Sequence, residues 1–440
     1  MNAGAGMNPE ASSLPSLRPG HGQRPRGRSP FGPAAPSILL ALGYAALLVV
    51  WLIVGDHLPG GRWFAVHLFT LGVLTNLVLT FSEHFGRTVT RTPGERSAVW
   101  PIVTNLGIAL TLIGLPTGWL PALAIGATTV TVSVFAAYRR LRHMRRSAIG
   151  ARFAWIARIY ERAHGAFIHG AVFGALLGVG LVSGTWYAST RLAHLHANVL
   201  GWGGLTLLAT LVFFGPTMAR CQIEPGADAR AARWLRHGAT GLSVAVLVLL
   251  LTALDGPWGL AAQAVSGAGL AVYATAATLV CLPVFRAVYR ARVTAARPLV
   301  LGVCIWFPLF AWGDVAVVAT GTWRWLDLLG TVALAGVLAQ AITATLIYLA
   351  PMLRGHTTEA RDVLRERLEI GARSRAVLLN LGVLTAALGA ARVVDGLPLF
   401  AIGGVAVGAA LASALLAGLW PTGVEAPPRA STSSPAESDG

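Results

Sequence analysis

The chain has 440 residues, of which 55% are hydrophobic and only 12% are charged. Soluble globular proteins carry roughly 25% charged residues, so this composition excludes a set of soluble domains and indicates a polytopic membrane protein. The formal net charge is +16, and all 34 basic residues are arginine. Because these arginines fall in short clusters between apolar runs, they are typical of membrane topology and not of nucleic-acid binding.

About twelve apolar runs follow an N-terminal stretch that has none. Residues 1–36 are rich in Gly, Pro, Ser and Arg, which predicts a disordered cytoplasmic tail and not a cleaved signal peptide. Each later run has ~18–25 residues, enough to cross ~30 Å of hydrocarbon as a helix. The predicted spans are 37–54, 63–83, 98–115, 119–138, 165–184, 194–216, 238–254, 258–282, 298–320, 325–350, 376–391 and 397–419. Residues 421–440 again have the composition of a disordered cytoplasmic tail, so we expect an all-α fold with one transmembrane domain over 37–420.

The connections between these spans alternate in arginine content. Most of the arginines lie in 84–97, 139–164, 217–237, 283–297 and 351–375, and the other connections are short and rich in tryptophan. An excess of arginine marks the cytoplasmic side, so we expect a multi-pass protein of the plasma membrane with both termini in the cytoplasm. Residues 151–163 are predicted to form an amphipathic helix on the inner surface. Residues 357–370 (TTEARDVLRERLEI) are predicted to form a capped, charge-balanced cytoplasmic helix.

Spans two, six and ten share a local pattern. Spans six and ten both end in A-T-L-(V/I)-aromatic-x-x-P, at 209–216 and 344–351. When spans six and ten are aligned on their prolines, Gly201 matches Gly336, and each of the three spans carries a polar residue five positions before a glycine. The pairs are His67 and Gly72, His196 and Gly201, and Thr331 and Gly336. The pattern predicts three four-helix repeats, and membrane proteins built in this way usually place the functional site between the repeats.

Three histidines, His67, His194 and His196, lie near the outer ends of spans two and six. An ionisable side chain inside a span is costly and is therefore a candidate functional residue. Neutral imidazole is a ligand of haem iron, copper and zinc. Residues two apart are about 200° apart around a helix, so His194 and His196 cannot both face one partner. The three residues predict haem b or a copper ion between His67 and one of the other two, or else hydrogen bonds at the outer interface with no cofactor.

A second group of histidines, His84, His164 and His169, lies near the inner ends of spans two and five. These residues are a second candidate metal site, or side chains at the level of the lipid headgroups. The remaining polar residues within spans include Asp314, Asn76 and Asn198. Such residues commonly form hydrogen bonds between helices, and Asp314 is in addition a candidate for a proton or cation relay.

Sequence motifs of common enzymes are missing from the chain. We find no P-loop, nucleophile elbow, HExxH motif or dinucleotide-binding glycine motif in a strand–helix context. The sequence therefore does not predict ATP hydrolysis, acyl transfer or dinucleotide chemistry. We expect no complete enzyme activity from this chain on its own.

Three segments resemble a group of actinobacterial membrane proteins described as copper-oxidase or nitrite-reductase-like. The segments are VHLFTLGVLTNLVLTFSEHF (66–85), HLHANVLGWGGLTLLATLVFFGPTMAR (194–220) and LAGVLAQAITATLIYLAPMLRG (334–355). The membrane module of that group is similar to the twelve-helix subunit I of haem–copper oxidases and to the NnrS haem–copper membrane proteins. The resemblance implies that His67 is a haem ligand and that the His-x-His pair serves cofactors near the outer face.

The chain departs from the oxidase pattern in its histidines. The His-x-His pair is on span ten in the oxidases but on span six here, and span ten has no histidine. The chain also has no adjacent His-His pair on span seven and no His-x3-Tyr on span six. The resemblance therefore implies haem or copper binding linked to respiration, nitrogen-oxide handling or copper homeostasis, and not a complete terminal oxidase. Two alternatives stay open. One is a metal or small-solute transporter that uses Asp314. The other is a non-catalytic membrane anchor that docks a cupredoxin or another electron-transfer protein on the outer face.

Overall fold

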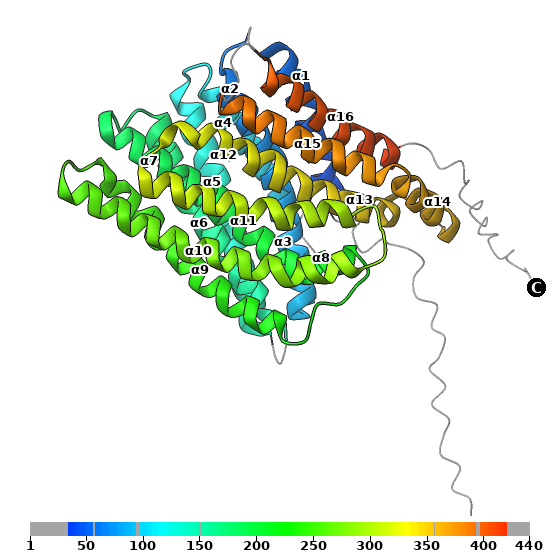
Figure 1. The fold of residues 1–440 in the computed structure, drawn as a ribbon. Coiled ribbons are helices and arrows are strands. Elements are labelled where there is room, and N and C mark those ends of the chain that lie inside the picture. The colour runs from blue at the N-terminus through cyan, green and yellow to red at the C-terminus, as the bar shows by residue number, and fades with distance from the viewer. Residues whose placement is uncertain are drawn as a thin grey trace, which may run out of the picture.

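The computed structural model describes residues 34–55, 58–93, 97, 99–148, 152–355, 357–392 and 397–419. Throughout these residues the regular structure is helical, without a strand, so the expected all-α fold is confirmed (Figure 1). Nine helical runs in the described residues are long and apolar enough to cross a membrane. The protein is therefore an integral membrane protein. The two predicted tails lie outside the described residues, except that α1 already begins at Ala35.

The nine apolar runs are formed by single helices or by several helical segments in continuous succession. They are α1 (Ala35–Val54); α2 (Gly61–His67), η3 (Leu68–Leu74) and α3 (Thr75–Thr90); α5 (Leu120–Ser147); α7 (Gly184–His196), η4 (Ala197–Gly204) and α8 (Leu205–Met218); α9 (Ala227–Leu249) and η5 (Leu250–Ala253); α10 (Pro257–Arg290); α11 (Arg297–Thr320); η6 (Trp323–Trp325), α12 (Leu326–Thr331), η7 (Val332–Ala339) and α13 (Gln340–Arg354); and α16 (Leu399–Leu419). Three other predicted spans overlap with α4 (Val99–Gly114), α6 (Ala154–Gly178) and α15 (Ala372–Ala390), although α6 begins and ends earlier than the predicted span of 165–184.

The runs are joined by short connections and therefore alternate in direction through the bundle (Figure 1). We call the end that holds the connections after α3, α5, α8, α10 and α13 the arginine-rich end. The opposite end is the tryptophan-rich end, where Trp119, Trp186, Trp258 and Trp323 lie near helix starts. Helices α9, α10 and α11 lie side by side, as do α15 and α16 (Figure 1).

Helix α6 corrects one expectation. The prediction of a separate surface helix over 151–163 is wrong, because α6 runs without a break from Ala154 to Gly178. Its first turns bury Ile156, Ala157 and Tyr160 in the bundle, and no glycine or proline interrupts them. A helix that already buries an apolar face gains nothing from turning onto the surface, so it continues directly into the apolar part of the bundle.

The predicted charge-balanced helix is confirmed as α14 (Thr358–Glu369). Thr357 caps it, because the hydroxyl oxygen accepts a hydrogen bond from the N–H of Ala360 at 3.1 Å. Hydrogen bonds from its own backbone N–H and from the Thr357 side chain lower the pKa of Glu359. Leu364 and Leu368 are buried on the face that packs against α13 and α16. The predicted N-terminal cap is therefore formed, with Thr357 as the N-cap residue.

Replacing Thr357 with alanine is expected to weaken the first turn of α14 by about 1 kcal/mol, because the Ala360 N–H loses its acceptor. Amide hydrogen exchange should become faster at residues 359–361 and stay unchanged in the last turn. Thr357→Ser is the matched control, since it keeps the hydroxyl. Equal protection in all three proteins would show that the cap does not stabilise this helix.

Three of the runs contain a π-helical segment, and the three segments occupy corresponding positions. The segments η3, η4 and η7 begin directly after His67, His196 and Thr331. A π-helical turn bonds residue i to i+5 and therefore accommodates an additional residue, which rotates the rest of the helix. Neighbouring helices approach closely there. A Cβ added at Gly72 would lie 2.5 Å from the Tyr44 ring. Segments of this kind are frequent at functional sites.

The centre of the bundle is packed around η4. Trp202, Tyr273 and Phe307 are fully buried and come from η4, α10 and α11. The Tyr273 hydroxyl donates to the carbonyl of Leu200 at 2.9 Å, so a side chain satisfies a backbone acceptor inside the π-helical segment. Gly204 makes room for this hydroxyl, since an added Cβ would lie 2.3 Å from the oxygen. These contacts hold the segment that follows His196 in one register.

Candidate histidine site

The structure brings His67 and His194 together. His67 is the last residue of α2, and His194 lies in the last turn of α7. The centres of their imidazole rings are 6.4 Å apart, and the ring planes differ by 21°. The two helices are far apart in the sequence. The run that carries His194 begins at Gly184 and not at 194 as predicted, so His194 lies within the run and not at its outer end. These two runs are the pair of spans for which the sequence predicted a shared cofactor.

Backbone carbonyls fix the tautomer of both rings. Nδ1 of His67 lies 2.8 Å from the carbonyl oxygen of Trp63, and Nδ1 of His194 lies 2.7 Å from that of Gly170. A carbonyl oxygen only accepts hydrogen bonds, so Nδ1 carries the proton in each ring. Nε2 of a neutral ring then presents a lone pair, as in histidines that bind metals. Neither Nε2 has a hydrogen-bond partner among the described residues.

Aromatic and glycine residues around the two rings restrict their orientation. Trp63 stacks on His67 with a centroid distance of 4.1 Å. On the other side, a Cβ added at Gly174 of α6 would lie 2.7 Å from Cε1 of His194. Asn198 donates from its side-chain amide to the carbonyl of His194 at 2.8 Å and packs against Gly170. Gly174 and Gly170 thus let α6 approach the histidine helix closely.

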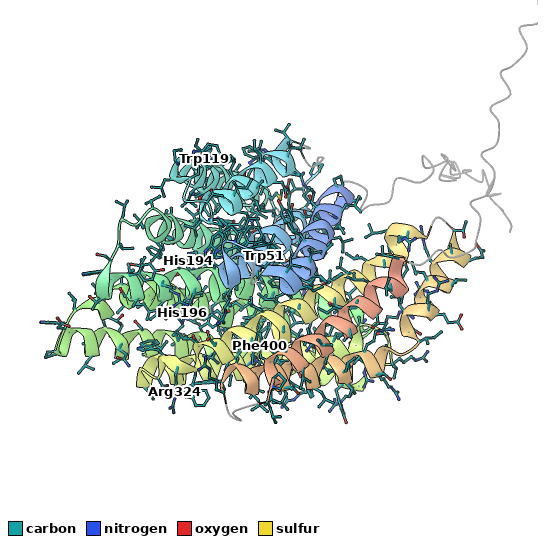
Figure 2. The ribbon with its side chains drawn as sticks, turned by 90° about the horizontal axis from the view of Figure 1, so that it is seen from above. Trp51, Trp119, His194, His196, Arg324 and Phe400 are labelled. Carbon is teal, nitrogen blue, oxygen red and sulfur yellow. The ribbon has the colours of Figure 1, made fainter. Side chains whose placement is uncertain are left out.

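His196 lies near His194 in the bundle (Figure 2) but contacts Asp314 of α11 instead of His67. Its Nε2 lies 3.0 and 3.1 Å from the two carboxylate oxygens of Asp314, and its Nδ1 lies 2.7 Å from the carbonyl of Leu192. Only 4% of the His196 side chain and 6% of the Asp314 side chain are exposed. His194 and His196 thus face different partners, as the helical period predicted. Both nitrogens of His196 are engaged.

The His196–Asp314 pair holds one proton between its two side chains. Nδ1 must carry a hydrogen to donate to Leu192, so the contact with Asp314 is either imidazolium with carboxylate or imidazole with carboxylic acid. The pair is neutral overall in both forms. Removal of the shared proton would leave a net negative charge in a buried site, which is costly.

The second group of histidines occupies three different environments. His164 is buried in α6; its Nδ1 donates to Tyr160, and its Nε2 lies 3.4 Å from the Ser82 hydroxyl. His84 lies at the edge of the Phe85 ring, and His169 is exposed. In the described part of the chain, no group of three or more His, Cys, Asp or Glu residues is placed to hold a metal ion.

Asn76 forms a hydrogen bond between helices. It exchanges amide hydrogen bonds with Asn105 of α4 at 2.9 and 3.0 Å and also donates to the carbonyl of Gly72. Buried amides of this type stabilise helix association by about 1 kcal/mol. Asn76 therefore joins α3 to α4.

Two buried acids at the arginine-rich end, Glu83 and Glu161, were not among the predicted site residues. Glu83 contacts Arg87 at 2.9 Å and Arg140 at 3.4 Å. Glu161 forms a bidentate ion pair with Arg145. The spacing of four between Glu83 and Arg87 was a visible signal. The Arg145–Glu161 pair joins α5 to α6, so no local spacing indicated it.

Comparison with known proteins leaves these geometric observations as the basis for function. No protein-family model matches the sequence, and no curated protein is significantly similar to it. No residue role is therefore transferred from a relative.

Proposed function

We propose that the chain crosses the plasma membrane about twelve times, with both termini in the cytoplasm. Nine runs already have the length and hydropathy of spans. The other three are α4 with 16 residues, α6 with 25 and α15 with 19, and each connects two of these runs. A helix of 16 residues is ~24 Å long, so α4 would cross a slightly thinned bilayer or extend by its flanking residues. The distribution of arginine supports the orientation.

We further propose that the spans form three four-helix repeats. The support is the location of η3, η4 and η7, each of which begins directly after the polar residue of the shared pattern. A π-helical segment is rare in proteins, so its occurrence at three corresponding positions is a strong sign of common origin.

We propose that the chain binds a redox metal, either haem iron or copper, between His67 and His194. The observation that carries this proposal is the pair of imidazoles with protonated Nδ1 and unengaged Nε2, 6.4 Å apart between centroids. Two neutral imidazoles with unengaged Nε2 atoms are donors of the kind that haem iron and copper take, so these residues would suit such a metal. A bound copper or haem iron would supply one-electron chemistry.

The residues of the chain would hold and orient this metal. His67 and His194 ligate, the carbonyls of Trp63 and Gly170 fix the ring tautomers, and Trp63 restrains the His67 ring. We infer a role in respiration, nitrogen-oxide handling or copper homeostasis, without the reaction of a complete terminal oxidase. A cupredoxin or electron-transfer partner at the tryptophan-rich end stays a prediction. The test is an optical spectrum together with metal analysis of the purified full chain, supplied with haem and with Cu⁺.

A metal or small-solute transporter is a second candidate, favoured by the buried His196–Asp314 pair. A titratable pair that links two helices inside a membrane can couple the gain or loss of a proton to helix movement. This function predicts proton-linked uptake of Cu⁺ into proteoliposomes that stops in Asp314→Asn and continues in the His67→Ala/His194→Ala double variant. Uptake that continues in Asp314→Asn, or no uptake by the wild type, contradicts it.

A further inference from the structure

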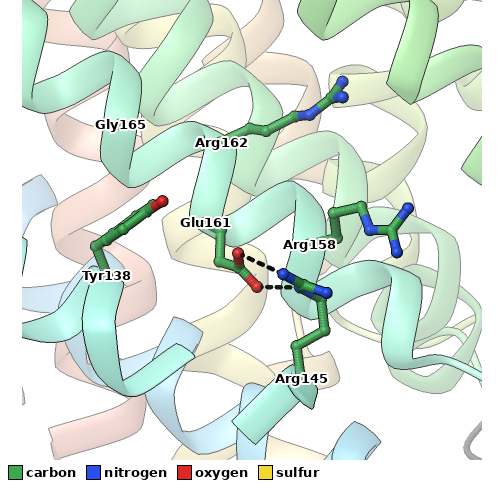
Figure 3. Close-up of a pocket in the computed structure, with 6 residues that line it drawn as sticks. All are labelled: Tyr138, Arg145, Arg158, Glu161, Arg162 and Gly165. Atoms are coloured by element: carbon green, nitrogen blue, oxygen red, sulfur yellow. Dashed lines mark hydrogen bonds and ion pairs between the residues drawn. The ribbon is translucent and has the colours of Figure 1, made fainter. Parts of the chain in front are cut away.

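Two adjoining pockets lie at the arginine-rich end, where α5, α6 and α9 meet, and Figure 3 shows the first of them. The first has a volume of about 420 Å³ and is lined by Tyr138, Arg145, Arg158, Glu161, Arg162 and Gly165. The second has a volume of about 350 Å³, shares Arg145 and Arg158 with the first, and adds Trp155 and Arg236. The shared arginines make the two pockets parts of one site, which we call the arginine pocket.

The arginine pocket carries an excess of positive charge. Four guanidinium groups line it, and Glu161 is the one acid among the lining residues. Glu161 is already paired with Arg145, whose Nη2 lies 3.2 Å from Oε2 (Figure 3). Arg162 donates to the backbone carbonyl of Arg236 at 2.8 Å, which leaves its charge uncompensated. Arg158 and Arg236 have no carboxylate partner among the described residues, and both repel Arg162.

A residue that lines the same site carries a buried donor. The indole N–H of Trp155, which lines the second pocket, is buried and has no acceptor within the described residues. Buried donors are normally satisfied, so this N–H is available to an acceptor that a ligand would bring. The phenol of Tyr138 lines the first pocket and offers a second donor. The site thus combines unpaired arginines with neutral donors, which is the chemistry that binds phosphate oxygens.

Exposed apolar side chains continue from the pocket toward the middle of the bundle. Phe135 stacks on Tyr138 one turn along α5, and both Phe135 and Val132 are exposed. On a helix of an integral membrane protein, such side chains face acyl chains. A ligand with a phosphate headgroup and acyl chains would therefore be accommodated along its whole length. Basic pockets between spans are known to bind lipid headgroups that carry more than one phosphate.

We propose that the arginine pocket binds the phosphate headgroup of an anionic phospholipid, with one phosphate in each adjoining pocket when the headgroup carries two. Arg158 and Arg236 contact phosphate oxygens, Trp155 donates its N–H, and Glu161 holds Arg145 in position. The ligand bridges α5, α6 and α9 at the membrane surface. The site is separate from the histidine pair and does not depend on a bound metal.

The test is native mass spectrometry of the full chain released from nanodiscs. The nanodiscs contain phosphatidylcholine alone, or phosphatidylcholine with phosphatidylglycerol or with cardiolipin. We expect the wild type to retain anionic lipid in preference to phosphatidylcholine. The Arg158→Gln/Arg236→Gln double variant should bind it about thirtyfold more weakly, since each arginine near anionic headgroups contributes about fivefold. Arg233→Gln is the matched control, because Arg233 is exposed on α9 outside the pocket and should leave retention unchanged.

A second variant separates binding from folding. Trp155→Phe keeps an aromatic side chain but removes the N–H together with the five-membered ring of the indole, so it should reduce retention of anionic lipid even if the arginine variant fails to fold. If both Trp155→Phe and a folded Arg158→Gln/Arg236→Gln protein retain as much anionic lipid as the wild type, the proposal is overturned. Inorganic phosphate is the competing probe. Displacement of all bound lipid by millimolar phosphate, without preference for anionic lipid, would assign the site to a free phosphate and overturn the lipid source.

Discussion

Replacing either His67 or His194 with alanine is expected to abolish metal binding by the chain. Only these two imidazoles supply the unengaged Nε2 atoms of the pair, so the loss of one leaves a single ligand. Loss of a partner outside the ligand set typically weakens metal sites 10–100-fold, and loss of a ligand should exceed about 100-fold. The Soret band, or the copper content measured after gel filtration, should fall to background in both variants.

His169→Ala is the matched histidine control, because His169 is exposed and lies on α6. It should keep the full metal content. A finer pair of variants tests the ring position without touching a ligand. Gly174→Ala adds a Cβ 2.7 Å from Cε1 of His194 and must displace the ring, whereas Gly165→Ala in the same helix meets open space. Metal loss in Gly174→Ala alone supports the site. A metal-free wild type, or metal retained in both histidine variants, refutes it.

Replacing Asp314 with alanine is expected to lower the free energy of unfolding by about 3–5 kcal/mol, because it leaves His196 buried without its partner. Asp314→Asn should cost less. The asparagine amide can donate to Nε2 of a neutral His196, so the hydrogen bond survives while the shared proton is lost. Denaturant titration in detergent, followed by circular dichroism, measures both variants.

The control for this prediction is an ion pair at the protein surface. Arg62 and Asp327 are 2.9 Å apart, but 66% and 51% of their side chains are exposed. Asp327→Ala should change the stability by about 0–1 kcal/mol, since exposed pairs are screened by water. If Asp314→Ala lowers the free energy of unfolding no more than Asp327→Ala does, the buried His196–Asp314 pair does not stabilise the contact between its two helices.

The two site predictions separate the two candidate functions. A metal that depends on His67 and His194 but not on Asp314 supports an electron-transfer role. Proton-linked uptake that depends on Asp314 but not on His67 or His194 supports a transporter. The His67–His194 pair and the His196–Asp314 pair lie on opposite sides of α7, since His194 contacts α6 and His196 contacts α11. One helix could therefore serve both a metal and a proton site, with π-helical η4 directly behind them.

The positions of the helices could be predicted from the sequence because hydropathy is a local property. Backbone groups in hydrocarbon must bond within their own segment, so an apolar run of sufficient length forms a helix whatever its neighbours are. The same reasoning located α14, whose cap and charge spacing are also local. It failed at α6, where charged residues suggested a surface helix. Glu161 is in fact neutralised by Arg145 of another helix.

The candidate site could be predicted only in part, for a related reason. The helical period showed that His194 and His196 diverge, because that angle depends on the helix alone. The partner of each ring depends on how distant helices pack. Asp314 lies 118 residues from His196, and Gly170 lies 24 residues from His194. Local patterns carry no information about such contacts. The π-helical segments likewise form where side chains such as Tyr273 satisfy a displaced carbonyl, which requires a neighbouring helix in place.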